Sequence, residues 1–307
     1  MAELVALMDL GSNAARFLLA RITPGVGYRV LHKERVQTRL GGGRSGVLPV
    51  EAVDQTLSSV SRFLSRFATG DGAHPRLVAV ATAAVRDASN RDRLIDGLRQ
   101  REGVDVRLLS GKEEAHLGAL AAMRSMRVRD GVIADLGGGS LQITRVRAGR
   151  ILSAASVPVG AVSMTRRFLR GDPPGLREIR SLRQEVRDQV LGILPPARPG
   201  DELLGLGGTV RALARLHLAT PGVRQRSRHG LRLDQSDVTA IRERLEALPL
   251  RKRRRLRGLK AERADIILAG AVTIEELMVF GGYVVLTVCK GGVRDGVLWR
   301  ETFNGLG

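Results

Sequence analysis

The sequence predicts an α/β protein made of two related halves, and three observations support this prediction. The segment Met8-Asp-Leu-Gly-Ser-Asn13 is echoed by Ala134-Asp-Leu-Gly-Gly-Gly-Ser140. Each segment ends a short apolar run of the kind that forms a buried strand. The chain has 307 residues, of which 43% are hydrophobic and 26% are charged, so each half is long enough to bury its own core.

In the first half, an opening meander of strands is followed by alternating helices and strands. Pro49 suits the first turn of a helix, and apolar residues recur at helical spacing from Val50 to Phe67. The strands are expected at 4–9, 15–22, 28–37, 76–81 and 104–109, and the other helices at 91–101 and 111–126.

The same order of elements starts again near residue 131, with a second glycine-rich turn after its first strand. The strands are expected at 131–135, 141–146, 151–157, 202–205 and 283–288, and the helices at 175–194, 209–218, 235–248 and 262–278. The sequence therefore predicts two α/β domains, 1–124 and 125–307.

Composition limits the class of protein. A single cysteine, Cys289, excludes an internal disulfide framework, and no apolar run reaches the length of a membrane-spanning helix. The chain enters a strand-like segment at Leu4 without a basic leader. We therefore expect a cytoplasmic protein with no membrane partner, and the sequence leaves a homodimer open.

The net charge of +19 comes mainly from arginine, because only five of the 50 basic residues are lysines. Guanidinium groups match phosphate oxygens well, which favours a polyanionic partner, although GC-rich coding would also raise the arginine content. The aromatic content of 3% counts against proteins that stack on single-stranded nucleic acid, and no specific nucleic acid is expected. The basic run at 251–257 is either a solvated helix face or turn, or a surface that binds a polyanion.

Three glycine-rich loops are candidate phosphate-binding loops. Asp9 and Asp135 end the first strand of each half, where a carboxylate can bind a cation or orient a water molecule. The glycines that follow let backbone N–H groups approach a phosphate. The third loop, around Gly207, lies between a strand and a helix N-terminus, which also favours an anion. A tight strand-to-helix connection is the alternative for this loop.

Glu113 and Glu114 open the helix that is expected at 111–126. With Ser110 as N-cap, Glu113 falls at position N3 and completes a capping box. Glu114 then points about 100° further around the helix, where it is free to act as a general base on a water molecule. An ordinary surface glutamate is the alternative, and for Arg86, beyond a strand end, a surface arginine is the alternative to a phosphate clamp.

These motifs resemble those of the exopolyphosphatase/guanosine pentaphosphate phosphohydrolase (Ppx/GppA) family, which belongs to the actin/sugar-kinase/heat-shock ATPase superfamily. The matching segments follow the family's order across nearly the whole chain. They are DLGSN at 9–13, ATAAVRDASN at 81–90, LSGKEEAHL at 109–117, DLGGGS at 135–140, GLGGT at 205–209, ERADIILAG at 262–270 and GGVRDGVL at 291–298. The resemblance implies two ribonuclease H-like domains with an interdomain cleft, in the short form of the family.

The resemblance also implies roles for individual positions. Glu114 matches the family's catalytic glutamate, which the capping argument singles out independently. Asp9 and Asp135 match the paired aspartates near its Mg²⁺ and its attacking water. The positions that match phosphate-binding residues are Gly11, Ser12, Asn13, Arg16, Arg86, Gly137, Gly138, Gly139, Ser140, Gly207, Gly208, Thr209 and Arg263. Arg263 is expected in the first turn of its helix, where a simple surface charge is the alternative.

One position departs from the family pattern. Gln142 stands where the family usually has a glutamate that is thought to help position the water or the metal. Glutamine keeps an acceptor oxygen but cannot take up a proton. If that carboxylate shares the role of base, its loss lowers the rate by roughly 10²–10⁴-fold; if Glu114 is the base alone, the loss is smaller.

The sequence thus predicts a magnesium-dependent hydrolase of phosphoanhydride bonds that releases terminal orthophosphate from inorganic polyphosphate. Guanosine pentaphosphate is the alternative substrate, because the same loops would bind it. Gln142 leaves open a polyphosphate- or alarmone-binding sensor with little turnover. A sugar kinase of the same superfamily is disfavoured by the phosphatase-type motifs at 110–115 and 262–270.

Overall fold

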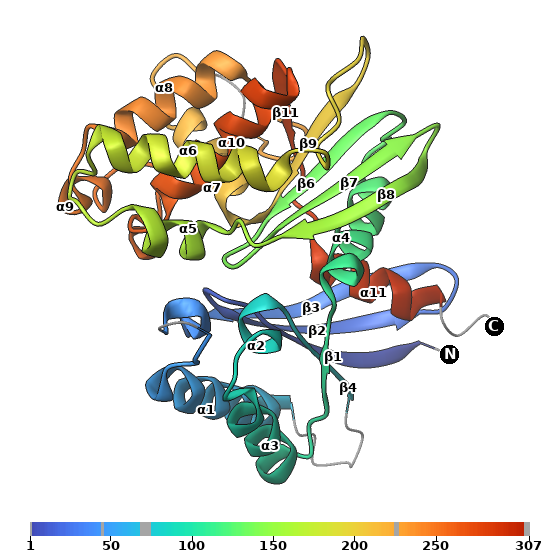
Figure 1. The fold of residues 1–307 in the computed structure, drawn as a ribbon. Helices are drawn as coiled ribbons and strands as arrows, with labels where there is room; N and C mark the ends of the chain where they lie inside the picture. Colours follow the sequence, from blue (N-terminus) through green and yellow to red (C-terminus); the bar gives the residue numbers. More distant parts are fainter. Residues whose placement is uncertain (1, 44–45, 68–74, 224–226, 304–307) are drawn as a thin grey trace. The chain divides into compact units, whose positions relative to one another are not determined.

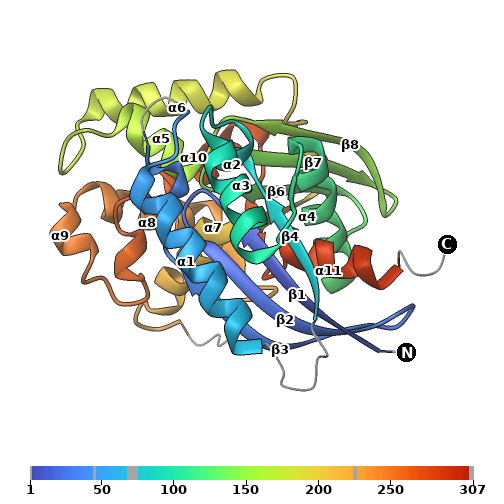
Figure 2. The ribbon, with the colours of Figure 1, turned by 90° about the horizontal axis from the view of Figure 1, so that it is seen from below.

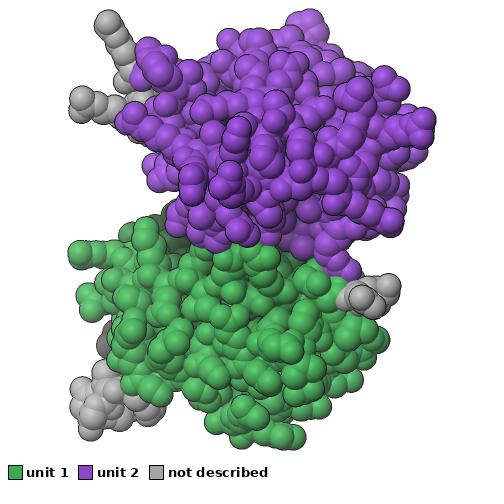
Figure 3. Space-filling view, turned by 90° about the vertical axis from the view of Figure 1, so that its left-hand side faces the viewer, with its two compact units in different colours: residues 1–114, 294–307 green, residues 115–293 purple. Residues whose placement is uncertain are grey.

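The computed structural model describes residues 2–43, 46–67, 75–223 and 227–303. The chain forms two compact units, which Figure 3 distinguishes by colour. Unit 1 comprises residues 1–114 and 294–307, and unit 2 comprises residues 115–293. In the described part of the chain, no helix combines the length and the apolar character that crossing a membrane requires.

Unit 1 contains a five-stranded mixed sheet (Figure 1). Its order is β3-β2-β1-β4-β5, in which β1 to β3 are antiparallel neighbours and β1, β4 and β5 run parallel. Parallel neighbours require crossover connections, which helices supply here. The strands are β1 (Glu3–Leu10), β2 (Ala15–Thr23), β3 (Gly27–Val36), β4 (Arg76–Ala81) and β5 (Val106–Leu108). The other elements are η1 (Leu40–Gly42), α1 (Val50–Phe67), α2 (Ala83–Arg86) and α3 (Arg91–Glu102).

The two faces of β1 have different neighbours. Ala6, Met8 and Leu10 belong to a core that includes residues of α1 and α3, and Figure 2 looks toward this side of the sheet. Because side chains alternate along a strand, Asp9 points to the opposite face. There Arg294 of α11 (Val293–Phe303) approaches Asp9 to 3.5 Å. The last helix of the chain therefore lies on the face of the unit 1 sheet that carries Asp9.

Unit 2 repeats this design with a six-stranded sheet of order β10-β11-β9-β6-β7-β8. Strands β6 to β8 form an antiparallel meander, β6, β9 and β11 run parallel, and β10 pairs antiparallel with β11. The strands are β6 (Gly131–Leu136), β7 (Leu141–Arg147), β8 (Arg150–Val157), β9 (Glu202–Leu206), β10 (Arg232–Asp234) and β11 (Val285–Val288). The helices are α4 (Gly111–Ser125), α5 (Ala161–Phe168), α6 (Leu176–Val190), α7 (Gly207–Leu218), α8 (Gln235–Glu246), α9 (Leu250–Arg253), η2 (Ala261–Arg263) and α10 (Ile267–Gly281).

The unit 2 sheet is covered on both faces. Val132, Ala134 and Leu136 of β6 belong to the large core with α6, α7, α8 and α10. Ile133, on the opposite face, clusters with alanines of α4. Asp135 shares the face of Ile133 because side chains alternate along the strand. Asp9 thus lies on the face of its sheet that α11 contacts, and Asp135 on the face of its sheet that α4 contacts.

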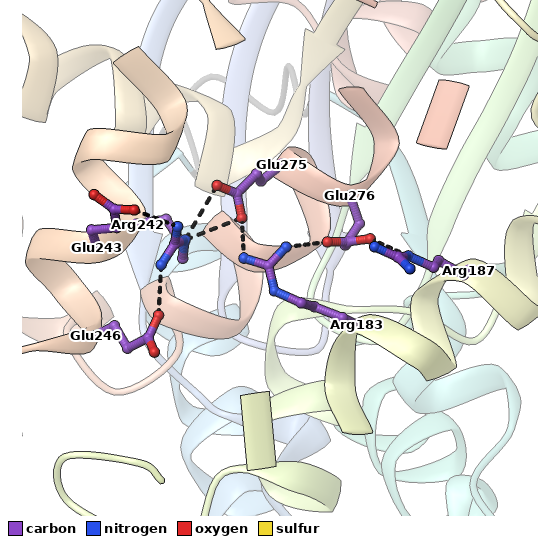
Figure 4. A network of polar contacts seen from close by, with 7 residues as sticks. All are labelled: Arg183, Arg187, Arg242, Glu243, Glu246, Glu275 and Glu276. Atoms are coloured by element: carbon purple, nitrogen blue, oxygen red, sulfur yellow. Dashed lines mark hydrogen bonds and ion pairs between the residues drawn. The ribbon is translucent and has the colours of Figure 1, made fainter. Parts of the chain in front are cut away.

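An ion network with two buried carboxylates joins three helices of unit 2 (Figure 4). Glu275 and Glu276 of α10 are 3% and 0% exposed. Arg183 of α6 bridges both carboxylates, Arg187 donates to Glu276 at 2.6 Å, and Arg242 of α8 donates to Glu275 at 3.1 Å. Buried carboxylates are tolerated when paired and hydrogen-bonded, so this network fixes α6 and α8 against α10.

The predicted α/β fold with two ribonuclease H-like domains is confirmed. The repeated sheet order, a three-stranded meander followed by parallel strands, is present in both units. The compact units differ from the predicted domains 1–124 and 125–307 at two places. Unit 1 ends at Glu114, near the start of α4 rather than after it, and the chain returns to unit 1 from Arg294 onward.

Two further differences concern individual elements. The sequence did not predict α2, α5, β10 or α11, and α10 begins at Ile267 rather than near residue 262. Arg263 therefore lies in the 3₁₀ turn η2 and not in the first turn of α10. Its side chain is buried in contact with the loop at Gly208, so the alternative of a surface charge at a helix end is wrong.

Candidate functional site

Asp9 is clamped by two arginines in unit 1. It is the second-last residue of β1, pairs in register with Arg16 of β2, and is 6% exposed. Its Oδ2 atom accepts a hydrogen bond from Nη1 of Arg16 at 3.3 Å and lies 3.5 Å from Nε of Arg294. Burial, followed by the nearby charge of Arg16, lowers the pKa of Arg294. Two cations therefore share one buried carboxylate.

Sequence reasoning assigned no role to Arg294. The residue belongs to the segment 291–298, which resembles a family motif. The motif therefore contained the arginine but did not indicate its role. Its partner could not be identified locally, because Asp9 lies at the other end of the chain. The structure brings Arg294 together with Asp9 and Arg16.

The loop after β1 is held by the 3₁₀ turn η1. The backbone N–H of Gly41 donates to the carbonyl of Ser12 at 2.7 Å, and that of Arg39 donates to the carbonyl of Asn13 at 3.3 Å. A Cβ at Gly41 would lie 2.9 Å from Cβ of Ser12, which explains why a glycine is needed there. Within the described residues, the buried side-chain nitrogen of Asn13 has no hydrogen-bond partner, so an unused donor lies in the loop that was predicted to bind phosphate.

The predicted capping box at the start of α4 is confirmed. The N–H of Ser110 donates to the Glu113 carboxylate at 2.8 Å, and the N–H of Glu113 donates to Oγ of Ser110 at 3.2 Å. The hydrogen bonds from Ser110, first from its backbone, lower the pKa of Glu113 to about 2. Glu113 is therefore used in capping the start of α4.

Glu114, the next residue, is buried rather than on the surface, with an exposed fraction of 4%. Its Oε1 atom accepts a hydrogen bond at 2.7 Å from Nη1 of Arg86, which also donates to the carbonyl of Leu109. Burial acts to lower the pKa of Arg86, but its hydrogen bonds to Asp87 and Glu114 outweigh burial and raise it. The alternative of a surface glutamate is thus wrong. Arg86, whose side chain is 24% exposed, is not a plain surface arginine, because it forms a partly buried pair with Glu114.

In unit 2, Asp135 lies among glycines. A Cβ at Gly207 would be 2.9 Å from Oδ1 of Asp135, and Cβ atoms at Gly118 and Gly292 would be 3.4 and 3.9 Å from Oδ2. Gly207 has a φ of +94°, and a Cβ there would overlap the carbonyl oxygen of Leu136. Only glycine therefore lets the start of α7 approach this carboxylate so closely.

Gln142 lies beside Asp135. The two residues pair in register between β7 and β6 and are 3% and 8% exposed. Nε2 of Gln142 donates to Oγ of Ser140 at 2.7 Å and to Oγ of Ser156 at 3.1 Å. The amide therefore holds the serine of the glycine loop in place, a function that requires no negative charge.

The glycine loop at 137–140 is fixed by the start of α5. The N–H groups of Ala161 and Val162 donate to the carbonyls of Gly137 and Gly138 at 3.0 and 2.8 Å. A Cβ at Gly160 would overlap the Gly138 carbonyl, so the contact is backbone against backbone. The loop carbonyls are thereby drawn toward α5, which leaves the opposite side of the loop for an anion.

Arg263 completes the third loop. Its guanidinium group lies against the backbone of Gly208, where a Cβ would clash with it, and its Nη2 atom lies 3.5 Å from Oγ1 of Thr209. Thr209 is fully buried in the first turn of α7. The structure thus brings Arg263 together with two of the predicted phosphate-binding residues at a helix N-terminus, where backbone N–H groups favour an anion.

The two aspartates differ in how well they suit Mg²⁺. Asp135 and Gln142 offer carboxylate and amide oxygens, and Mg²⁺ takes its remaining ligands from water and substrate phosphates. Asp9 is less suited, because its Oδ2 atom already contacts two guanidinium groups. No group of three or more histidine, cysteine, aspartate and glutamate residues that could hold a metal occurs among the residues the structure describes.

Comparisons with known proteins identify relatives of the chain. The chain is 36% identical to an uncharacterized protein of Streptomyces coelicolor over 312 residues, covering 98% of this chain and 90% of the relative. It is 30% identical to exopolyphosphatase 1 of Mycobacterium tuberculosis over 311 residues, covering 97% of this chain and 88% of the relative. The crystal structure of an exopolyphosphatase from Cytophaga hutchinsonii has the same fold, with a TM-score of 0.87, 23% identity and coverage of 99% and 98%.

The sequence profile of the Ppx/GppA phosphatase family matches residues 18–304. This match spans the glycine loops of unit 2, the Arg86–Glu114 pair and Arg294. The chain therefore belongs to the Ppx/GppA phosphatase family.

Proposed function

We propose that this protein hydrolyses phosphoanhydride bonds and releases terminal orthophosphate from inorganic polyphosphate. The observation that carries the proposal is the buried Glu114, held by Arg86 at 2.7 Å beside a capping glutamate. Membership of a phosphatase family and the exopolyphosphatase relatives support the reaction class. The net charge of +19 suits a polyanionic substrate.

In the proposed reaction, Glu114 is the general base. It takes a proton from a water molecule whose oxygen attacks the terminal phosphorus, while the bond from that phosphorus to the bridging oxygen breaks. An arginine at hydrogen-bond distance favours the ionised form of a carboxylate, so Arg86 keeps Glu114 ready to accept the proton. Arg86 also restricts the orientation of Glu114, because its Nη1 atom is itself anchored on the Leu109 carbonyl.

The remaining residues would position the phosphates. Phosphoryl transfer depends mainly on alignment and on neutralising charge. The glycine loops supply backbone donors, Asn13 an amide nitrogen, and Arg263 a positive charge at the start of α7. A bound Mg²⁺ ion, held through Asp135 and Gln142, would neutralise phosphate charge.

The test is the release of orthophosphate from long-chain polyphosphate and from guanosine pentaphosphate, each with Mg²⁺ and with a chelator. We expect faster release from polyphosphate, increasing with chain length, and its loss on chelation. Preferential hydrolysis of the nucleotide would instead assign the protein to guanosine pentaphosphate. Release that is unaffected by chelation would contradict the magnesium proposal alone.

Gln142 favours a second candidate, a binding protein with little turnover, because this position has no carboxylate beside Asp135. Such a protein would bind polyphosphate tightly and release no phosphate under any of these conditions. Release of phosphate that disappears in the Glu114→Gln variant would reject it.

A further inference from the structure

A dense basic segment lies outside the residues discussed so far. Residues 249–260 contain seven arginines and lysines and no acidic residue. Six of these side chains are exposed. Lys260 lies 3.8 Å from the Glu262 carboxylate, and we refer to the other five as the basic surface. They are Arg251, Lys252, Arg254, Arg255 and Arg257.

Arg253, within the same segment, has a different role. It is 4% exposed, and its Nε atom donates to the carbonyl of Leu248 at 2.8 Å. Its other nitrogens lie 3.4 Å from the Ala264 carbonyl and from the Asp172 carboxylate. Asp172 also accepts a hydrogen bond from the backbone of Leu250 at 2.6 Å. One buried arginine thus fixes the segment, while its neighbours project into solvent.

The basic surface differs from those exposed arginines of the chain that are paired with a carboxylate. Arg62 and Arg66 share Glu34, Arg76 pairs with Glu3, and Arg99 pairs with Asp105. Among the described residues, by contrast, no carboxylate lies at ion-pair distance from any side chain of the basic surface. An arginine excess from coding bias would leave charges paired or scattered, whereas here five unneutralised cations are concentrated on one turn.

The basic surface is close to the candidate phosphate loops of unit 2. Along the chain, it precedes η2, whose Arg263 contacts the start of α7, and Arg253 reaches the carbonyl of Ala264 just beyond η2. Helix α5 provides a second connection. It starts at the Gly137–Gly138 carbonyls and leads to the loop of Asp172, which accepts a hydrogen bond from Leu250 of the basic segment (Figure 1). The eight residues of α5 span only about 12 Å at 1.5 Å per residue.

We propose that the basic surface binds the part of a long polyphosphate chain that extends beyond the residues holding its terminal phosphates. This inference rests on the proposed function, and it adds a second binding region that acts only on long chains. A row of cations spaced along a turn suits a flexible anion that carries a charge on every unit. The contribution of the basic surface to polyphosphate binding is electrostatic, so it must weaken as the ionic strength rises.

Polyphosphate fits this surface better than a nucleic acid does. Residues 249–260 contain no tyrosine, tryptophan or phenylalanine, so no aromatic ring of the segment could stack on a base. Proteins that bind single strands generally combine basic grooves with such rings. The surface thus offers charge without base recognition, which is what a chain of bare phosphates requires.

The test neutralises the surface while keeping its buried anchor. In one variant, Arg251, Lys252, Arg254 and Arg255 are all replaced by glutamine and Arg253 is retained. The matched control carries four glutamines at exposed arginines elsewhere, namely Arg21, Arg29, Arg150 and Arg198, so both proteins lose the same net charge. Thermal unfolding of both variants checks that each remains folded.

Two measurements are made on the wild type and both variants. The first is kcat/KM for tripolyphosphate and for long-chain polyphosphate. The second is direct binding of labelled long-chain polyphosphate at several salt concentrations. We expect the surface variant to bind long chains about tenfold more weakly, with a flatter salt dependence, and to hydrolyse tripolyphosphate as the wild type does. An equal loss in the control, or equal losses for both chain lengths, would overturn the proposal. Displacement of polyphosphate by a single-stranded oligonucleotide at lower concentration would also overturn it. A wild type that binds long chains but releases no phosphate would instead refute the proposed function alone.

Discussion

Gln142 lies opposite Asp135 in the β6–β7 ladder, as Arg16 lies opposite Asp9 in the β1–β2 ladder. The two units thus place different partners beside equivalent aspartates, a neutral amide in one and a cation in the other. Asp9 is neutralised twice, by Arg16 and Arg294. This difference makes Asp135 the better candidate for contact with a metal-bound phosphate.

Replacing Gln142 by glutamate tests what the amide means for catalysis. Two buried carboxylates would then face each other across neighbouring strands, and like charges in this arrangement repel. A divalent cation would relieve the repulsion, so we expect Gln142→Glu to raise kcat by roughly 10-fold or more at saturating Mg²⁺ and to lower Tm in a chelator. Phosphate release and thermal unfolding at a series of Mg²⁺ concentrations measure both effects. Gln142→Met, of similar size and without charge, is the control, and an unchanged rate in Gln142→Glu would contradict our account of this position.

Glu114→Gln tests the proposed base. The substitution keeps the size of the side chain and an acceptor for Arg86, but the amide cannot take up a proton. We expect kcat to fall by roughly 10²–10⁴-fold with little change in KM. Glu113→Gln removes the same charge from the adjacent position and should retain most of the activity, because Glu113 is used in the capping box. Equal losses in the two variants would mean that charge at the start of α4 matters, and not a base at position 114.

Arg294→Gln tests the clamp on Asp9. The variant leaves Asp9 with one guanidinium partner and detaches α11 from the end of β1, so both activity and stability should fall, the latter by about 1–3 kcal/mol. Steady-state kinetics and chemical unfolding measure the two effects. Arg300→Gln, on the same helix and with its Nε atom 3.8 Å from the Glu301 carboxylate, is the control. If the control loses as much activity as Arg294→Gln, the Asp9 contact is not what matters.

The capping box predicts a specific dependence of stability on pH. Because folding lowers the pKa of Glu113 to about 2, its contribution is fully present above the ordinary glutamate pKa of about 4.3 and is lost as the pH falls toward 2. Unfolding free energies measured from pH 5 to pH 2 should thus fall less steeply in Glu113→Gln than in the wild type. Ser110→Ala should cost about 1 kcal/mol at neutral pH. Parallel pH curves for wild type and Glu113→Gln would refute the capping role.

Local patterns were sufficient to predict the strands other than the three-residue β10, the glycine loops and the cap of α4. The capping box could be derived because all of its partners lie within four residues. Glycine turns after buried strands are likewise visible in the sequence, since both the apolar run and the conformational requirement are local. Candidate site residues that lie within a single loop could therefore be identified from the local sequence or from the family resemblance.

Contacts between distant segments could not be predicted in this way. The Arg86–Glu114 pair depends on how α2 lies against the start of α4, and the Arg294–Asp9 pair depends on the return of the chain end to unit 1. Helix α5 has only eight residues, too few for its apolar periodicity to stand out from a loop. Arg263 was predicted in a helix because the pattern after it is strongly helical, but its contact with Gly208 keeps it in the turn before that helix.

Gly207 offers the last test, which separates backbone strain from steric overlap. Gly207 and Gly222 have nearly the same φ, +94° and +90°, but a Cβ at Gly222 would meet no atom of the described residues within 4 Å. Alanine at Gly222 should therefore cost only the strain of a left-handed residue, about 1–2 kcal/mol. Alanine at Gly207 adds overlap with the Leu136 carbonyl and with Asp135, so we expect a cost of about 3 kcal/mol or more together with weaker phosphate binding. Chemical unfolding and binding of tripolyphosphate compare the two variants. Equal destabilisation by both substitutions would show that the start of α7 does not need to approach Asp135 as closely as the structure indicates.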